Sequence, residues 1–354
     1  MYNCFYVLSG NNNATYIFNT SHWFAIKESL KFYRAYTFKG KLQKSILTYF
    51  LFVVGKFFPS ICKSKDAITI YLKEHIKSDV DFDLDENSSV LISPTRDKVI
   101  VNHHEQYFHK FAFGKSFKKV QNETDSYKLL QNSKEFQVPS LMNLKIDEQL
   151  SFCSFKLMNP PVNTNDQLKV IDNLQEILVE FFNSGAIKKT VKLTDYMEDL
   201  LKRFHSLNIL PTDDLTSYLE KIQKEHNTET MPLGLVHRDF KPWNTLLRDT
   251  LLIFDCEEAI FDGPPLEDLF NFYIDPKIRY FSPSKLSNSI LSEKKILLYE
   301  DYLKRLEINV HYLVLLFTYL LERIIFWYNE NNPETLQAYR SFLEYLIQQN
   351  KFEV

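Results

Sequence analysis

The sequence predicts an α+β fold in which a strand-rich segment is followed by a longer helical one. Between residues 81 and 160, short apolar runs alternate with turn residues, as is typical of antiparallel strands. Between residues 161 and 354, apolar residues recur three and four positions apart, as is typical of amphipathic helices. The 354 residues allow about two domains. We therefore expect a small antiparallel-sheet domain over 81–160 and a larger helical domain over 161–354, preceded by an N-terminal extension, 1–80, of unassigned role.

The sheet domain is expected to open with a hairpin. Residues 89–93 and 98–102 are apolar, and the Pro-Thr-Arg-Asp sequence between them is typical of a turn. An aromatic strand follows at 107–113, and apolar spacing predicts a helix over 118–131. The remaining strands expected in this domain begin at Val138 and cover residues 150–158.

The helical domain is expected to begin near Thr164, which forms a capping box with Gln167 at a helix start. Amphipathic spacing predicts two more helices over 195–207 and 214–225. The apolar block at 308–321 is well short of the ~20 residues that a membrane span needs. It indicates a buried core helix.

The N-terminal extension contains a basic and apolar stretch at 41–58. The apolar run within this stretch is too short to span a bilayer, so the sequence predicts no transmembrane segment here. Two interpretations stay open, namely packing against the main domain and peripheral contact with a membrane surface. The first ten residues lack a basic stretch followed by an apolar run, so we expect no signal peptide.

Composition excludes several function classes. The chain has seven glycines, and none are spaced as a dinucleotide-binding or Walker A loop requires. The formal net charge of -3 gives no basic face for general nucleic-acid binding. The four cysteines have neither disulfide-framework nor metal-site spacing, which fits a reducing cytoplasm.

One segment, residues 233–259, carries polar groups between two apolar strands that are expected to form a hairpin. Asp239 lies just before one strand, and Asn244 begins that strand. Asp255 ends the return strand. Oxygen ligands at one end of a hairpin suit a hard cation such as Mg²⁺. An Asp five residues before an Asn is the arrangement of kinase catalytic loops, where the Asp acts as the base. Lys241 could neutralise charge on a transferred phosphoryl group.

The sequence HRDFKPWN, followed by IFDCEEA, resembles the aminoglycoside phosphotransferase and choline kinase family. The resemblance implies a two-lobed, protein-kinase-like fold, a nucleotide substrate (ATP or GTP) and Mg²⁺. It implies that Asp239 is the catalytic residue and that Asn244 and Asp255 bind magnesium. Asp268 matches a family residue that braces the catalytic loop. The specific match covers residues 233–268.

The same resemblance implies a strand lysine and a helix glutamate that together hold the nucleotide phosphates. Lys110 lies inside the aromatic strand, where an unpaired charge would be costly, and Glu123 lies on the apolar face of the next helix. The phosphate-covering loop is then the turn at 93–98, which has no glycine. Ser93, Thr95 and backbone N–H groups are its candidate phosphate ligands.

These observations predict a kinase that phosphorylates a hydroxyl of a small molecule, such as a sugar, an aminoglycoside-like compound, an amino alcohol or a glycan intermediate. Two alternatives stay open. A protein kinase is favoured by His237-Arg238-Asp239 but not by the absence of D-F-G and A-P-E sequences. A catalytically weak, kinase-like binding protein is favoured by the glycine-free loop but not by the intact Asp239 and Asn244.

Overall fold

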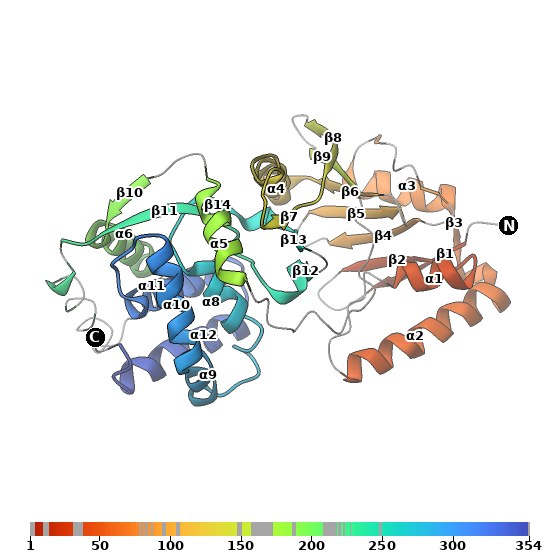
Figure 1. Cartoon of the computed structure of the whole chain (residues 1–354). Coiled ribbons are helices and arrows are strands. Elements are labelled where there is room, and N and C mark those ends of the chain that lie inside the picture. The colour runs from red at the N-terminus through yellow and green to blue at the C-terminus, as the bar shows by residue number, and fades with distance from the viewer. Residues whose placement is uncertain are drawn as a thin grey trace. The chain divides into compact units, whose positions relative to one another are not determined.

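The computed structural model describes residues 4–9, 14–30, 38–77, 79–80, 82, 84–85, 88–93, 97–103, 107–146, 151–156, 173–185, 189–207, 218, 221, 224–226, 228–247 and 250–352 (Figure 1). The chain divides into two compact units. The first unit contains residues 1–128 and 139–160, and the second contains residues 129–138 and 161–354. The first is built on a sheet and the second is mostly helical, which confirms the predicted α+β class.

The first unit contains one antiparallel sheet whose eight described strands follow the order β3-β1-β2-β4-β5-β6-β9-β8. The predicted hairpin is present, with Ser93 of β4 opposite Lys98 of β5. The predicted helix after the third strand is α4 (Phe117–Leu130). The strands are β1 (Cys4–Ser9), β2 (Thr15–Asn19), β3 (Lys63–Ser64), β4 (Ser88–Ser93), β5 (Lys98–His103), β6 (Tyr107–Ala112), β8 (Leu141–Ile146) and β9 (Ser151–Lys156).

Residues before position 80 contribute three strands that the sequence did not predict. The β1–β2 hairpin joins the rest of the sheet through β2, where Tyr16 lies opposite Leu91 of β4. Both strands are rich in aromatic and β-branched residues, and Gly-Asn-Asn-Asn between them is a hairpin composition that could have been recognised. The same region contains the helices α1 (Trp23–Ser29), α2 (Phe38–Phe57) and α3 (Lys65–Ile76) and the short helix η2 (Pro59–Ile61).

The part of the sheet at β2 is covered on both faces. Neighbouring residues of a strand point to opposite faces, and β2 shows this clearly. Ile17 belongs to a cluster with Ile68 and Leu72 of α3, whereas Phe18 belongs to a cluster with Ile26 of α1 and Leu51 of α2. At β2, therefore, helices from the N-terminal 76 residues cover both faces of the sheet.

The second unit places its longest apolar helix, α11 (Tyr312–Asn329), in the core, where residues 312–325 are buried. This confirms the buried helix predicted from the block at 308–321. No described helix is both long and apolar enough to cross a bilayer. The predicted capping box at Thr164 and most of the predicted helix 214–225 lie outside the described residues. The other helices are α5 (Leu174–Asn183), α6 (Leu193–His205), α8 (Glu267–Ile274), α9 (Pro283–Ile290), α10 (Glu293–Arg305) and α12 (Pro333–Gln348).

Two small sheets carry the polar segment of the second unit. One has the strand order β10-β11-β14, made of Lys189–Lys192, Thr230–Val236 and Ile260–Gly263. The other has the order β12-β13-β7, made of Thr245–Leu247, Leu251–Ile253 and Phe136–Gln137. The antiparallel β12–β13 pair is the hairpin predicted from the sequence, with Thr245 opposite Ile253.

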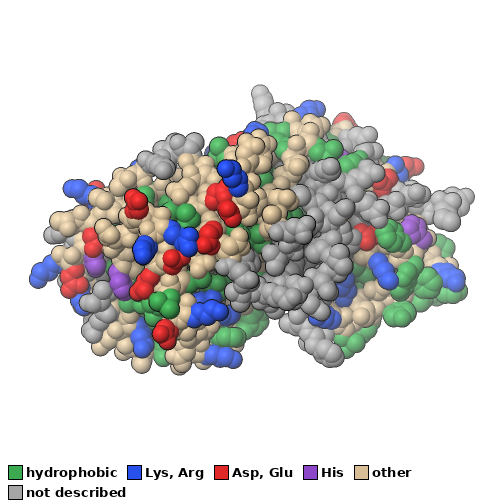
Figure 2. Space-filling model, viewed as in Figure 1, with side chains coloured by type: hydrophobic (Ala, Val, Ile, Leu, Met, Phe, Trp, Pro, Cys, Tyr) green, Lys and Arg blue, Asp and Glu red, His purple; other side chains and the backbone are tan. Residues whose placement is uncertain are grey.

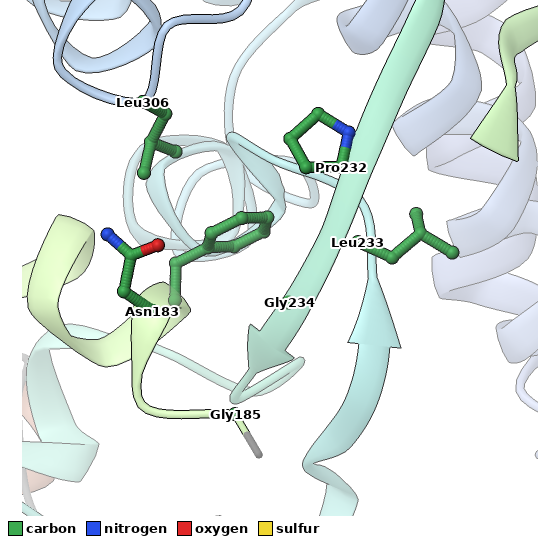
Figure 3. A pocket seen from close by; sticks show the side chains of 7 residues that line it. Asn183, Gly185, Pro232, Leu233, Gly234 and Leu306 are labelled. Carbon is green, nitrogen blue, oxygen red and sulfur yellow. The ribbon is translucent and has the colours of Figure 1, made fainter. Parts of the chain in front are cut away.

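Strand β11 passes close to the end of α5 at Gly234 (Figure 3). A Cβ at this position would lie 2.6 Å from the backbone oxygen of Phe182 and 2.8 Å from its ring. We expect Gly234→Ala to lower the free energy of unfolding by about 1–3 kcal/mol, because overpacking must shift the end of the helix. Urea unfolding measures this. Gly185→Ala is the control. It should lower the free energy of unfolding by less, because a Cβ at this position would lie 3.2 Å from its nearest neighbour, the backbone nitrogen of Leu235.

Candidate active site

The polar loop after β11 begins with His237, a fully buried side chain. Its Nε2 lies 3.0 Å from the backbone oxygen of Phe254, so Nε2 must carry the proton. Its Nδ1 accepts a hydrogen bond from the backbone N–H of Asp239 at 3.3 Å. A neutral imidazole satisfies both bonds, so His237 fixes the loop against the strand hairpin rather than facing a substrate.

Arg238 holds a left-handed backbone conformation, with φ of 62°, which is uncommon for a residue with a side chain. Hydrogen bonds hold both sides of this residue in place. Its N–H donates to Oδ1 of Asp268 at 3.0 Å, and its carbonyl oxygen accepts from Asn271 at 3.0 Å and Arg323 at 3.2 Å. These bonds stabilise a strained turn that directs the next residue, Asp239.

Asp268 accepts the backbone N–H groups of both His237 (2.8 Å) and Arg238 (3.0 Å). It therefore occupies the bracing position that the sequence resemblance implies. Burial raises the pKa of its carboxyl group from 3.8 to about 7, although the hydrogen bonds from the two backbone N–H groups act in the opposite direction.

The raised pKa of Asp268 predicts a pH dependence of stability. A carboxyl group whose pKa is higher in the folded state contributes stability below its unfolded pKa and loses it as the pH rises through the folded pKa. The contribution of Asp268 to the free energy of unfolding should therefore fall by about 4 kcal/mol as the pH rises from about 4 to about 8. We expect Asp268→Asn to remove this part of the slope in urea unfolding at several pH values. Asp262→Asn, at an exposed position on β14, should keep the wild-type slope.

Asp239 is held on both sides of its carboxylate. Lys241 Nζ lies 2.5 Å from Oδ1, and Asn244 Nδ2 donates to Oδ2 at 2.8 Å and to the backbone oxygen at 2.9 Å. Lys241 and Asn244 are buried, but the Asp239 side chain stays 29% exposed. The loop therefore presents one oriented, accessible carboxylate, the geometry that a general base needs.

The cation donors predicted from the sequence lie at one end of the β12–β13 hairpin. Asn244 ends a short helix, η6 (Pro242–Asn244), directly before β12, and its carbonyl oxygen accepts from the N–H of Phe254 at 3.1 Å. This bond places Asp255, the next residue, beside Asn244. The Nδ2 of Asn244 is used by Asp239, so the atom it would offer a cation is Oδ1. An amide oxygen and a carboxylate are a donor set that suits Mg²⁺.

The first unit brings Lys110 and Glu123 together. Lys110 Nζ lies 2.8 Å and 2.6 Å from the two carboxylate oxygens of Glu123, and Tyr127 donates to Oε1 at 2.7 Å. The glutamate side chain is fully buried and the lysine side chain is 6% exposed. This is a desolvated ion pair between β6 and α4, as the sequence pattern predicts.

The predicted phosphate-covering turn is described only at its ends. Ser93 closes β4 opposite Lys98, whereas Thr95 lies outside the described residues. At the far end of the turn, Asp97 accepts the backbone N–H of Lys115 at 3.1 Å. This bond ties the turn to the segment that leads into α4, the helix that carries Glu123.

The sequence profile of the phosphotransferase enzyme family matches residues 93–289, more than half of the chain. The chain belongs to the phosphotransferase enzyme family. The matched range contains every candidate residue described above, from Ser93 to Asp268. No curated protein matches the chain in sequence.

The solved structures that this phosphotransferase is similar to have low sequence identity to it. A proposed aminoglycoside phosphotransferase from Ralstonia eutropha has a TM-score of 0.50 at 12% identity, over 82% of this chain and 98% of that one. Aminoglycoside phosphotransferase APH(4)-Ia has a TM-score of 0.48 at 13% identity, over 80% and 99%. Choline kinase LicA from Streptococcus pneumoniae has a TM-score of 0.46 at 13% identity, over 80% and 99%. The family match and the likeness to the Ralstonia eutropha protein agree with the predicted fold, a small antiparallel sheet followed by a larger helical part.

The sequence missed two residues that complete this site in the phosphotransferase. Lys241 is bound by Asp275 Oδ2 at 2.8 Å as well as by Asp239, and Arg323 donates to the same Asp275 oxygen at 3.1 Å. Burial alone would lower the pKa of Lys241, but the Asp275 and Asp239 carboxylates raise it above its ordinary value. A sequence pattern could have found Asp275, because Asp268, Asn271 and Asp275 are spaced i, i+3, i+7. Arg323 lies in an otherwise apolar stretch, and no spacing of polar residues in the sequence pointed to it.

Proposed function

We propose that this phosphotransferase is an ATP-dependent small-molecule kinase that transfers the γ-phosphoryl group to a hydroxyl of its substrate. The observation that carries the proposal is the Asp239 carboxylate, fixed between Lys241 and Asn244 and still partly exposed. The acceptor classes that fit are a sugar, an aminoglycoside-like compound, an amino alcohol and a glycan intermediate. All of them offer an alcohol of the kind that a fixed carboxylate can deprotonate.

In the proposed reaction, Asp239 binds the acceptor hydroxyl and takes its proton. The hydroxyl oxygen forms a bond to the γ-phosphorus while the bond from that phosphorus to the bridging oxygen breaks, and ADP leaves with the bridging oxygen. Lys241 holds Asp239 in one orientation and places positive charge beside it. Positioning and electrostatic stabilisation of this kind are the main contributions a protein makes to phosphoryl transfer.

Asn244 Oδ1 and the Asp255 carboxylate are the proposed ligands for Mg²⁺, which supplies charge neutralisation to the nucleotide phosphates when bound. In the first unit, Lys110 is the proposed phosphate ligand. Its pairing with Glu123 supports this role, because the carboxylate keeps the ammonium group in one position. Ser93 and Thr95 are proposed to cover the phosphates from the turn after β4.

The experiment that tests the proposal is a thermal shift with ATP and Mg²⁺, followed by a screen of hydroxylated metabolites for stimulated ATP hydrolysis. We expect ATP with Mg²⁺ to raise the Tm of the wild-type chain, because a ligand that binds only the folded state stabilises it. Lys110→Met should lose at least about tenfold in ATP affinity. Lys128→Met, at an exposed position on α4, is the matched control and should bind like the wild type.

Two results would contradict this function. An unchanged Tm at millimolar ATP and Mg²⁺ would show that the chain does not bind the nucleotide that the proposed reaction requires. Hydrolysis stimulated only by peptides, and by none of the small alcohols, would make the chain a protein kinase instead.

A further inference from the structure

Helix α2 is apolar on two sides, and the described part of the first unit covers only one of them. Leu51 and Val54 are buried, and Leu47 packs against the same cluster, which includes Phe18 and Ile26. These residues follow the i, i+4, i+7 spacing of a single helix face. The inner face of this segment therefore packs against β2 and α1, which belong to the same N-terminal extension.

The outer face of α2 carries a second apolar stripe, which we call the α2 patch. Its large side chains are 42–66% exposed, whereas an ordinary surface helix carries polar residues there. Trp23 of α1 extends the patch, because its ring lies 5.9 Å from that of Tyr49. The patch consists of Leu42, Ile46, Tyr49, Phe50, Val53 and Phe57 of α2, continued by Phe58 and Ile61.

The sequence segment that contains the α2 patch carries charge of one sign. Between residues 29 and 65 the sequence has eight basic residues and no acidic one, although the whole chain has a net charge of -3. In Figure 2, Lys and Arg side chains lie beside hydrophobic ones in the region of α1 and α2. The eight are Lys31, Arg34, Lys39, Lys41, Lys44, Lys56, Lys63 and Lys65.

Lysines border the aromatic rings of this region directly. Lys56 Nζ lies 5.4 Å from the ring centre of Phe57, and Lys27 Nζ lies 5.2 Å from that of Trp23. Aromatic and aliphatic side chains on one face, with lysines at its border, are the composition of helices that lie in a membrane interface. The rings enter the boundary between headgroups and acyl chains while the ammonium groups stay at the phosphates.

We propose that the α2 patch docks the chain onto an anionic phospholipid surface, with α2 lying in the plane of the membrane. A second copy of the chain fits less well, because a symmetric contact would place the same basic segment against itself. A lipid surface satisfies both features at once, since its phosphates attract the lysines and its acyl region accepts the apolar side chains.

Vesicle sedimentation with the full chain tests the proposal. We expect binding to vesicles of phosphatidylglycerol and phosphatidylcholine, and much weaker binding to phosphatidylcholine alone. Raising the salt from about 0.1 M to about 0.5 M should weaken the binding through screening. Lys41→Gln with Lys56→Gln should weaken it about 25-fold, because each lysine near an anionic surface contributes about fivefold.

Apolar variants separate lipid insertion from charge attraction alone. Ile46→Gln with Phe57→Gln should weaken binding to the anionic vesicles at least about tenfold while the thermal stability of the chain stays close to that of the wild type. Ile70→Gln on α3 and Leu297→Gln on α10 replace residues exposed to a similar degree, at 58% and 59%, and should bind as the wild type does.

Three results would overturn the proposal. The first is failure of the wild-type chain to bind anionic vesicles, which would favour an acidic protein as the occupant of the patch. The second is equal binding by the Ile46 and Phe57 variant. The third is a dimer in sedimentation velocity that the same variant dissociates, which would assign the patch to a second copy of this chain.

Discussion

Asp239→Asn is expected to lower kcat by about 10²–10⁴-fold with the acceptor identified in the metabolite screen. The amide is nearly the same size as the carboxylate and can still accept the hydrogen bond from Asn244. It cannot take a proton from a hydroxyl group. Steady-state kinetics measures the effect, and the KM for ATP should change little because Asp239 is not a proposed nucleotide ligand.

The control for this variant is Asp262→Asn, which makes the same chemical change at an exposed position. It should keep the wild-type kcat. If Asp239→Asn keeps a kcat within about threefold of the wild type, Asp239 is not the general base, because that loss is below the range for such a group.

Asp275→Asn is expected to lower the free energy of unfolding by about 3–5 kcal/mol, the usual cost of breaking a buried ion pair from one side. The carboxylate of Asp275 lies 2.8 Å from Lys241 Nζ and 3.1 Å from an Arg323 nitrogen, and its side chain is 3% exposed. Its removal leaves a fully buried guanidinium group and a nearly buried ammonium group short of negative charge. Urea unfolding measures the loss.

The double variant Asp275→Asn with Arg323→Met tests whether this loss comes from uncompensated charge. Removing both partners leaves no orphaned guanidinium group, so the double variant should be more stable than Asp275→Asn alone. Additive losses from the two single changes would show that the two residues contribute through packing instead.

The sequence predicted the polar loop well because its residues are close along the chain. Asp239 and Asn244 lie five positions apart at the start of one hairpin strand, so local spacing alone indicated that they converge. Lys110 and Glu123 lie further apart, but each is a charge in an apolar element, and such charges need partners. Their ion pair therefore followed from elementary electrostatics.

Within the site, the contacts that the sequence did not predict are those between residues far apart in the chain. Arg323 reaches Asp275 across 48 positions and the carbonyl oxygen of Arg238 across 85. Periodicity shows which residues of a helix share a face, but it does not show which other helix that face meets. A buried arginine in an apolar block signals that a partner exists without naming it.

The pairing of β2 with β4 has a consequence for any attempt to shorten the protein. A chain beginning near residue 81 would lack β2 and would leave the N–H and C=O groups of β4 along that edge without their partners. Bare strand edges of this kind recruit strands from other molecules, and the result is aggregation. The N-terminal segment thus protects the edge of the sheet that carries Lys110. A shortened chain is therefore expected to lose solubility and the fixed position of that lysine at the same time.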